Sequence, residues 1–358
     1  MTSSRARSRA RIAGWSAAAA AVIVVVGVAL ALANSSGKAR QGGAGPAPTR
    51  IAAPIPTTTT NPARAPAMPA GGAYFGAFGQ PAAFTQQSAV AAVDSLQSQV
   101  GRRLDIVHSY LKWRAPFPTA SQRAFISGGS RLLLSWAGTD TLAVASGADD
   151  SWIRQRALAI KATHKPIFLE WRWEMNRPNL RAQVHSPADY IAAWDHIRSI
   201  FAQEHVENVA WVWCPTAIGF TGAGGQPSAA AFYPGNSEVD WVCSDAYPRA
   251  GPYTSFADVV QPFLAWASHI AKPIMIGEYG VPRSYGAQPR AQWLRGAAQT
   301  VRDDPQIKAL VYFDGDPIGN GPQTDYGLDN GSAPMLAFRR VAGERYFNPS
   351  GLPVSTSR

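Results

Sequence analysis

The feature that most constrains this sequence is the regular return of short, apolar, β-rich runs from residue 73 onward. Their starts are about 30 to 40 residues apart, which is the length of one strand-helix unit. The eight runs begin near Ala73, Leu104, Arg131, Pro166, Asn208, Val239, Lys272 and Lys308. Apolar residues recur at helical intervals between them, as in 188–201, 256–270 and 290–301. Eight units predict a single (β/α)8 barrel. An open, doubly wound sheet is the alternative, but it usually begins with a glycine-rich turn that this chain lacks.

The first 72 residues have a different composition. Four arginines, at positions 5, 7, 9 and 11, precede an uncharged run at 12–33 that is long enough to span a bilayer. Ala31-Leu-Ala33 also fits a small-residue cleavage site. We interpret 1–33 as a signal peptide or a signal-anchor transmembrane segment. The rest of the chain is then expected outside the cell, either secreted or anchored to the membrane.

Residues 34–72 are rich in Pro, Ala, Gly and Thr and are predicted to form a disordered linker. The barrel is expected at 73–345, with a C-terminal tail at 346–358.

The formal net charge of +10 comes mostly from the N-terminal part of the chain. Residues 1–72 contain eight Lys or Arg and no acid, which leaves 25 basic and 23 acidic residues in the remainder. The barrel therefore shows no sequence signature of nucleic-acid binding. The twelve tryptophans of the chain are either large core residues or platforms on which sugar rings stack, and the sequence leaves both interpretations open.

The chain has two cysteines, Cys214 and Cys243, which end consecutive predicted strands. A disulfide is possible in an oxidising compartment, and two buried free thiols are the alternative. Strand alternation places Cys243 on the face of Asp245, whereas Cys214 falls opposite Trp211 and Trp213. Pairing would therefore need a bend at one strand end.

A (β/α)8 barrel carries its chemistry at the carboxyl ends of the strands, and two of these ends deliver a glutamate. Glu174 ends the run 167–176, and Glu278 ends the run 272–280. Strand alternation would place Glu170, Arg172 and Glu174 on one face, with Trp171 and Trp173 on the other. We expect Glu170 to pair with Arg172, and we expect the remaining glutamates to lie at the surface.

Two carboxyl groups facing each other across a barrel mouth are typical of a glycoside hydrolase. Desolvation beside Trp171 and Trp173 would raise the pKa of Glu174, which suits it to the general acid/base role. Glu278 would be the ionised nucleophile, held by a hydrogen bond from the phenol of Tyr247. The other candidate substrate-binding residues lie at or just after strand ends: His108, Trp113, Trp136, Trp173, Asn176, Trp213 and Asp245.

The motifs along 73–342 resemble the family 26 glycoside hydrolases of the large retaining (β/α)8 clan. They are Glu174-Met-Asn176, Trp211-Val-Trp213 with Pro215, Val239-Asp-Trp241 with Asp245-Ala-Tyr247, and Glu278-Tyr-Gly280. The resemblance implies that Glu174 is the acid/base, that Glu278 is the nucleophile and that Tyr247 orients it. It also implies β-mannans, mixed-linkage β-glucans or β-xylans as substrates, cleaved without a cofactor. The chain departs from the family at Trp173, where His is usual, and at Glu170, where Arg is usual. It departs again at 177–180, where a glycine–aromatic run often follows the Asn.

The leading functional hypothesis is a monomeric, retaining endo-β-glycanase that hydrolyses β-1,4 or mixed-linkage bonds of a polysaccharide such as mannan or β-glucan. A non-catalytic, cell-surface glycan-binding protein on the same scaffold is the alternative, because fold does not determine function. A metal-dependent deacetylase is disfavoured. The histidines form no His-x-x-His pair, and Asp195-His196 falls in a predicted helix away from the rim.

Overall fold

A computed structural model describes residues 64–222, 227–249, 251–317, 319 and 321–355. The predicted signal or anchor segment at 1–33 and most of the predicted linker lie outside the described residues. Within the described ranges, no helix is both long enough and apolar enough to cross a bilayer.

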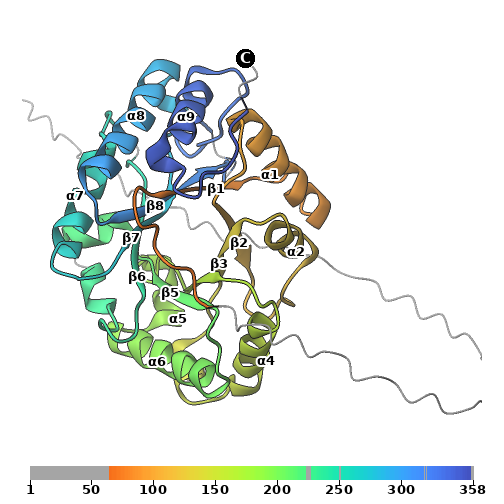
Figure 1. The fold of residues 1–358 in the computed structure, drawn as a ribbon. Coiled ribbons are helices and arrows are strands. Elements are labelled where there is room, and N and C mark those ends of the chain that lie inside the picture. The colour runs from red at the N-terminus through yellow and green to blue at the C-terminus, as the bar shows by residue number, and fades with distance from the viewer. Residues whose placement is uncertain (1–63, 223–226, 250, 318, 320, 356–358) are drawn as a thin grey trace, which may run out of the picture.

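Eight parallel strands close into one barrel in chain order, and the helices surround it (Figure 1). This confirms the predicted (β/α)8 fold. The strands are β1 (Tyr74–Gly79), β2 (Ile106–Leu111), β3 (Arg131–Trp136), β4 (Ile167–Trp171), β5 (Val209–Trp213), β6 (Trp241–Ala246), β7 (Ile274–Tyr279) and β8 (Ile307–Asp314). Each lies within or beside one of the predicted runs.

The helices follow the strands as the apolar periodicity predicts. They are α1 (Gln86–Val100), α2 (Ala120–Ser127), α3 (Thr141–Ala145), α4 (Asp150–Lys161), α5 (Arg181–Val184), α6 (Pro187–Gln203), α7 (Phe256–Ala267), α8 (Ala287–Asp303) and α9 (Ala333–Gly343). Short 3-10 helices include η1 (Pro178–Leu180), η2 (Ala217–Thr221), η4 (Ala229–Phe232), η5 (Arg283–Tyr285) and η6 (Arg345–Phe347). At the start of α6, the Ser186 hydroxyl accepts a hydrogen bond from the Asp189 N–H, and Pro187 occupies the first turn.

Strand alternation divides the buried side chains into two cores. A small inner cluster fills the barrel with residues such as Ile106, Leu133 and Phe168. A much larger outer cluster packs between the strands and the helices. Trp136 and Trp213 belong to this outer cluster and are completely buried. For these tryptophans the core interpretation is therefore correct.

The packed domain extends beyond the predicted limits of 73 and 345. Pro66 and Pro69 are buried, and the Tyr74 hydroxyl donates to the Ala67 carbonyl at 3.1 Å. On the C-terminal side, Phe347 is fully buried and the Ser355 N–H donates to the Gly101 carbonyl at 2.7 Å. The end of the predicted linker and most of the predicted tail therefore belong to the folded unit.

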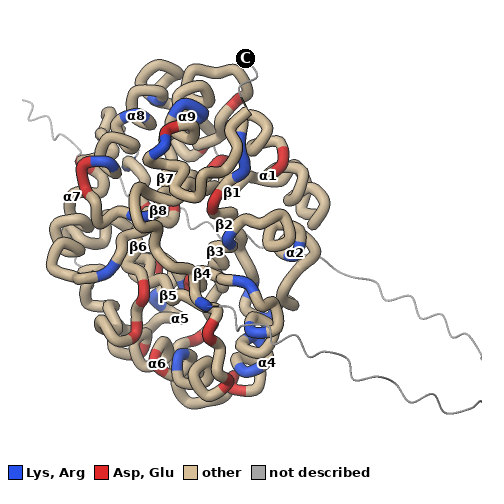
Figure 2. The backbone as a smooth tube through the Cα atoms, in the orientation of Figure 1, with Lys and Arg blue, Asp and Glu red and all other residues tan. Residues whose placement is uncertain are grey.

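Charged residues of both signs are dispersed over the helices and loops around the barrel in the view of Figure 2. This mixture fits the near balance of basic and acidic residues in the sequence after position 72. No large field of one sign is visible on this side of the described chain.

Cys214 and Cys243 form a disulfide that joins the end of β5 to β6, with their Cα atoms 4.3 Å apart. Both residues belong to the inner cluster. The predicted parity conflict was wrong because Trp211 and Trp213 face the helices, so Cys214 faces the barrel interior by ordinary alternation. The bridge fills the space beside Gly277 of β7. A Cβ atom at Gly277 would lie 2.5 Å from the Cys243 Sγ and 3.0 Å from the Cys214 Sγ.

We expect Gly277→Ala to lower the free energy of unfolding by about 1–3 kcal/mol, because the added methyl group overpacks the inner core against the disulfide. Denaturant unfolding would measure the change. Gly296→Ala is the matched control, since Gly296 lies inside α8 and a Cβ atom added there would meet only open space. That variant should gain about 0.5–1 kcal/mol from helix propensity. Equal stability of the two variants would contradict the packing argument.

Candidate active site

The backbone changes conformation directly after β4. The strand ends at Trp171, and both Arg172 and Glu174 have a φ of +52°. The left-handed region is costly for a non-glycine residue and is found where surrounding contacts impose it. Here the Arg172 N–H donates to the Trp136 carbonyl at 3.0 Å, and the Glu174 N–H donates to the Cys214 carbonyl at 2.7 Å. Two neighbouring strand ends thus hold the turn that presents Glu174.

This turn corrects two predictions made from strand alternation. Arg172 does not pair with Glu170, because its guanidinium donates to the Gln183 side chain instead. Glu174 does not sit between two tryptophans either. Trp171 faces the outer core and stacks on Tyr190 with ring centroids 5.5 Å apart, whereas Trp173 faces the barrel mouth.

The Glu174 carboxylate is paired with Arg177, one turn further along the chain. Only 9% of the Glu174 residue surface is exposed. Arg177 is one of the residues that replace the family's glycine–aromatic run, and sequence reasoning did not assign it a site role.

Glu278 lies near the end of β7 and receives two phenolic hydrogen bonds. The Tyr247 hydroxyl donates to Oε2 at 2.7 Å, which confirms the predicted contact. The Tyr110 hydroxyl donates to Oε1 at 2.5 Å. Tyr110 was not predicted, although its position at the end of β2, two residues after His108, gives it an inward parity. Each carboxylate oxygen therefore has one fixed donor.

Glu278 and Glu174 interact electrostatically. Burial, followed by the charge of Glu174, raises the pKa of Glu278 to about 7, and the two phenolic hydrogen bonds oppose this rise. The pKa values of Tyr110 and Tyr247 are raised well above their usual range, chiefly by burial and then by the charge of Glu278. Both phenols therefore stay protonated and act as hydrogen-bond donors.

A buried polar layer lies below Glu278. The Ser135 hydroxyl contacts both Glu170 Oε2 and His108 Nε2, and its oxygen lies 2.6 Å from the Nε2 atom. Burial lowers the pKa of His108 to about 3, which keeps the ring neutral. Its other nitrogen, Nδ1, lies 3.4 Å from the Tyr110 hydroxyl. His108 thus contacts the site through Tyr110.

The disulfide separates two buried acids on the barrel floor. Asp245 Oδ1 lies 3.3 Å from the Cys214 Sγ, and Glu170 Oε1 lies 3.9 Å from the Cys243 Sγ. Burial raises the pKa of both acids well above the usual range, and Glu278 raises both further. The four side chains are close enough to resemble a metal-ligand cluster. However, both sulfurs are committed to the disulfide and cannot serve as thiolates.

Aromatic rings surround the mouth of the barrel, and most of them were not predicted. The ring centroids of Phe78 and Phe313 are 4.8 Å apart, those of Tyr110 and Trp173 are 5.4 Å apart, and those of Tyr247 and Tyr326 are 4.7 Å apart. Trp173 was predicted as a substrate-binding residue, and it is half-buried at this mouth. Phe78, Tyr110 and Phe313 share the inward parity of their strands, which is the signal that could have identified them.

Three other tryptophans predicted to contact substrate do not reach the mouth. Trp113 and Trp136 stack on each other with centroids 4.3 Å apart in the outer core. Trp213 donates its indole N–H to the Phe232 carbonyl at 3.0 Å and packs against Trp266. These predictions were wrong because strand-end position was used without strand parity.

Asn176 joins the loops after β4 and β5. Its Nδ2 donates to Thr216 Oγ1 at 2.7 Å, and its Oδ1 accepts from the Thr216 N–H at 3.0 Å. The side chain thus stabilises the loop next to Glu174. His196, the histidine considered for a metal site, lies on α6 and contacts Asp150 at 2.6 Å, away from Glu278.

Comparisons with known proteins agree with this architecture. No protein-family model matches the chain. Endoglucanase H of Acetivibrio thermocellus is 28% identical over 290 residues, which cover 76% of this chain and 31% of that protein. The chain therefore spans about a third of the length of this curated relative.

Solved structures of β-mannanases share the fold. The β-mannanase from a symbiotic protist of the termite Reticulitermes speratus matches with a TM-score of 0.55 and 13% identity, covering 81% of this chain and 97% of that one. The Bacteroides ovatus family 26 β-mannanase matches with a TM-score of 0.55 and 16% identity, covering 77% and 90%. The Cellulomonas fimi endo-β-1,4-mannanase (double mutant) matches with a TM-score of 0.55 and 15% identity, covering 77% of this chain and 71% of that one. The chain thus shares the (β/α)8 fold of these mannanases at low sequence identity.

We expect Glu278→Gln to stabilise the fold at neutral and higher pH. The pKa of Glu278 is raised from 4.5 to about 7 in the folded protein, so folding favours the protonated form. Stability is therefore unaffected below about pH 4.5 and falls as the pH rises through about 7. The variant should gain up to about 3 kcal/mol at about pH 8 and little at about pH 4. Unfolding curves at both pH values measure this, with exposed Glu207→Gln as the control. An equal gain in the free energy of unfolding at both pH values would contradict the raised pKa of Glu278.

Proposed function

We propose that this chain is a retaining glycoside hydrolase that cleaves internal bonds of a neutral β-glycan, such as mannan or β-glucan, by double displacement. The observation that carries the proposal is the paired environment of two carboxyl groups at one barrel mouth, with Glu278 held by two phenols and Glu174 on an imposed backbone turn. The similarity to Endoglucanase H and to the family 26 mannanase structures supports the same class.

In the first step, the Glu278 carboxylate attacks the anomeric carbon while Glu174 donates its proton to the leaving oxygen. The bond to the leaving sugar breaks and a glycosyl ester forms on Glu278. The two phenols suit Glu278 to this role, because one donor on each oxygen fixes the plane of the carboxylate and opposes the rise of its pKa. Arg177 pairs with Oε2 of Glu174, and the second oxygen of Glu174 is not part of that ion pair.

In the second step, Glu174 takes a proton from a water molecule, and that water displaces Glu278 from the sugar. The proton that Glu174 takes from this water replaces the one that it gave to the leaving sugar in the first step. Glu170 and Asp245 contribute by remaining neutral on the barrel floor, since burial raises their pKa values. The reacting pair then carries the negative charge at the mouth.

We further propose that the protein acts outside the cell. The disulfide between Cys214 and Cys243 requires an oxidising compartment, and the arginine-rich start followed by an apolar run supports export. Whether the protein is released or stays anchored would follow from mass analysis of the mature N-terminus.

A non-catalytic glycan-binding protein is the second candidate. The ion pair between Arg177 and Glu174 favours it, because that contact occupies one oxygen of the proposed proton donor. Purified protein incubated with mannan, mixed-linkage glucan and xylan distinguishes the two candidates. Release of shorter chains supports the enzyme, and binding without release supports the alternative.

Removing either carboxyl group should reduce hydrolysis of the polymer by on the order of 10³-fold or more. Azide then separates the roles. With Glu278→Ala, azide can replace the nucleophile and give a glycosyl azide of inverted configuration. With Glu174→Ala and an aryl glycoside, which needs little acid assistance, azide can attack the ester on Glu278 and give the retained configuration. Product anomers are read by NMR. The opposite pairing of variant and anomer would reverse the assignment.

Tyr110→Phe should shift the acidic limb of the kcat/KM profile to higher pH. Loss of one hydrogen bond to the carboxylate raises the pKa of Glu278 further, so a higher pH is needed to ionise it. A hydrogen bond to a charged group is worth about 1.5–3 kcal/mol, which corresponds to roughly one to two pH units. Tyr233→Phe is the control, because that phenol bonds Asn236 instead. An unmoved limb in Tyr110→Phe would rule out this role.

A further inference from the structure

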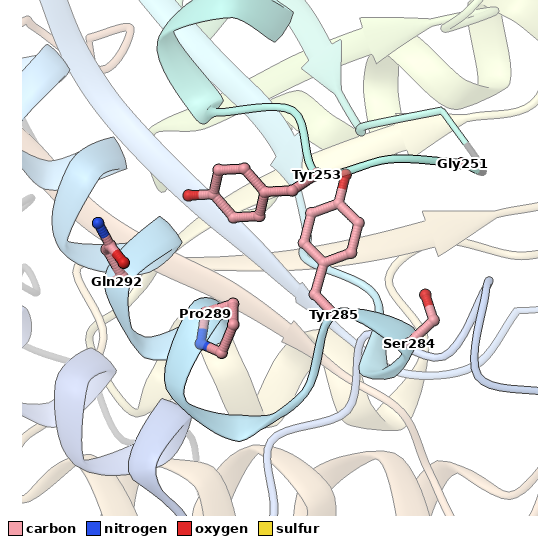
Figure 3. A pocket seen from close by; sticks show the side chains of 6 residues that line it. All are labelled: Gly251, Tyr253, Ser284, Tyr285, Pro289 and Gln292. Carbon is pink, nitrogen blue, oxygen red and sulfur yellow. The ribbon is translucent and has the colours of Figure 1, made fainter.

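A second group of aromatic side chains lies beside the barrel mouth, between the segments that follow β6 and β7. It borders a recess of about 430 Å³ that does not include the two glutamates. The lining residues are Gly251, Tyr253, Ser284, Tyr285, Pro289 and Gln292 (Figure 3). They come from the β6–α7 connection, from η5 and from the first turns of α8.

The chemistry of the recess suits an uncharged, hydroxyl-rich ligand. Tyr253 is 48% exposed, and its ring lies 5.1 Å from the ring of Tyr285 at an interplanar angle of 38°. None of the six lining residues carries a charge. The hydroxyl of Ser284 and the amide of Gln292 can bond to sugar hydroxyls, while an exposed ring offers an apolar face for the C–H side of a pyranose.

The aromatic pair is held in place by hydrogen bonds of its own segments. The Tyr285 hydroxyl accepts from the Thr254 N–H at 3.0 Å and donates to the Pro252 carbonyl at 3.2 Å. The Trp293 indole N–H donates to the Thr254 carbonyl at 3.0 Å, and the Ser284 N–H donates to the Pro322 carbonyl at 2.9 Å. A surface ordered in this way loses little conformational entropy when a ligand binds.

The recess is also within reach of a chain bound at the reacting carboxylates. Tyr253 follows Tyr247 by six residues, and Tyr247 contacts Glu278. Six extended residues span at most about 20 Å. Tyr285 follows Glu278 by seven residues, which span at most about 25 Å. These separations are short enough for one polysaccharide chain to span.

We propose that the Tyr253–Tyr285 recess is a glycan-binding site outside the cleavage site, which holds a distal part of a neutral β-glycan chain. This rests on the proposed function, because the occupant is taken to be the polymer that is cleaved. Short substrates cannot span the two sites, so the recess favours polymers over small aryl glycosides.

The first experiment measures binding without turnover. In the Glu278→Gln protein, affinity electrophoresis through gels containing mannan, mixed-linkage glucan or xylan reports retardation by each polymer. Adding Tyr253→Ala should weaken the affinity for the retarding polymer about five- to tenfold, whereas Tyr253→Phe, which keeps the ring, should retain it. Leu158→Ala, at an equally exposed site on α4, is the control for surface truncation.

The second experiment uses the protein with both glutamates intact. The ratio of kcat/KM for the polymer to kcat/KM for a short aryl glycoside should fall about five- to tenfold in Tyr253→Ala and stay constant in Leu158→Ala. Retardation that does not change with Tyr253→Ala, or the absence of retardation by every polymer, overturns the proposal that the recess binds a glycan. Binding that depends on Tyr253 without any hydrolysis supports the recess and overturns the proposed function. Hydrolysis of the polymer with an unchanged kcat/KM ratio in Tyr253→Ala supports the proposed function and overturns the binding role of the recess.

Discussion

The constraint on which the rest of this structure depends is the inside–outside alternation that barrel closure imposes on every strand. Side chains of one parity share a narrow interior, and those of the other pack under the helices. The interior is too small to hold the water that would solvate polar side chains, so polar groups placed there must hydrogen-bond to one another. His108, Ser135 and Glu170, from three consecutive strands, do so directly. The same alternation brings the two cysteines into contact beneath the mouth.

This constraint explains how much could be predicted from the sequence. The eight strands, the two strand-end glutamates and the contact of Tyr247 with Glu278 followed from local periodicity and motif position. Strand parity, which the same sequence contains, separates side chains that face the helices from those that face the interior. It assigns Trp136 and Trp213 to the outer core, and it assigns Tyr110 to the interior. At the end of β7 a register shift breaks this alternation: Ile274 and Ile276 face the outer core, whereas Glu278, of the same sequence parity, bonds Tyr247 at the mouth.

Other features could not be derived from periodicity at all. The left-handed backbone at Arg172 and Glu174 depends on carbonyl groups of β3 and of the residue after β5, which are distant in sequence. That turn breaks the alternation, so the expected pairing of Glu170 with Arg172 fails and Arg177 becomes the partner of Glu174. Tertiary hydrogen bonds set this geometry, and a single sequence does not display them.

The departures from the family pattern form one electrostatic unit. With a neutral His108 and no pairing with Arg172, Glu170 has no cation on the barrel floor, and burial keeps its carboxyl group protonated. A charged Glu170 would raise the pKa of Glu278 still further and oppose its ionisation. The free-energy cost of burying Glu170 is therefore low, because its carboxyl group is neutral. The positive charge absent from the floor is supplied at the mouth by Arg177, which lowers the pKa of Glu278. The Arg177 guanidinium therefore lies beside the two carboxyl groups whose charges change during the proposed reaction.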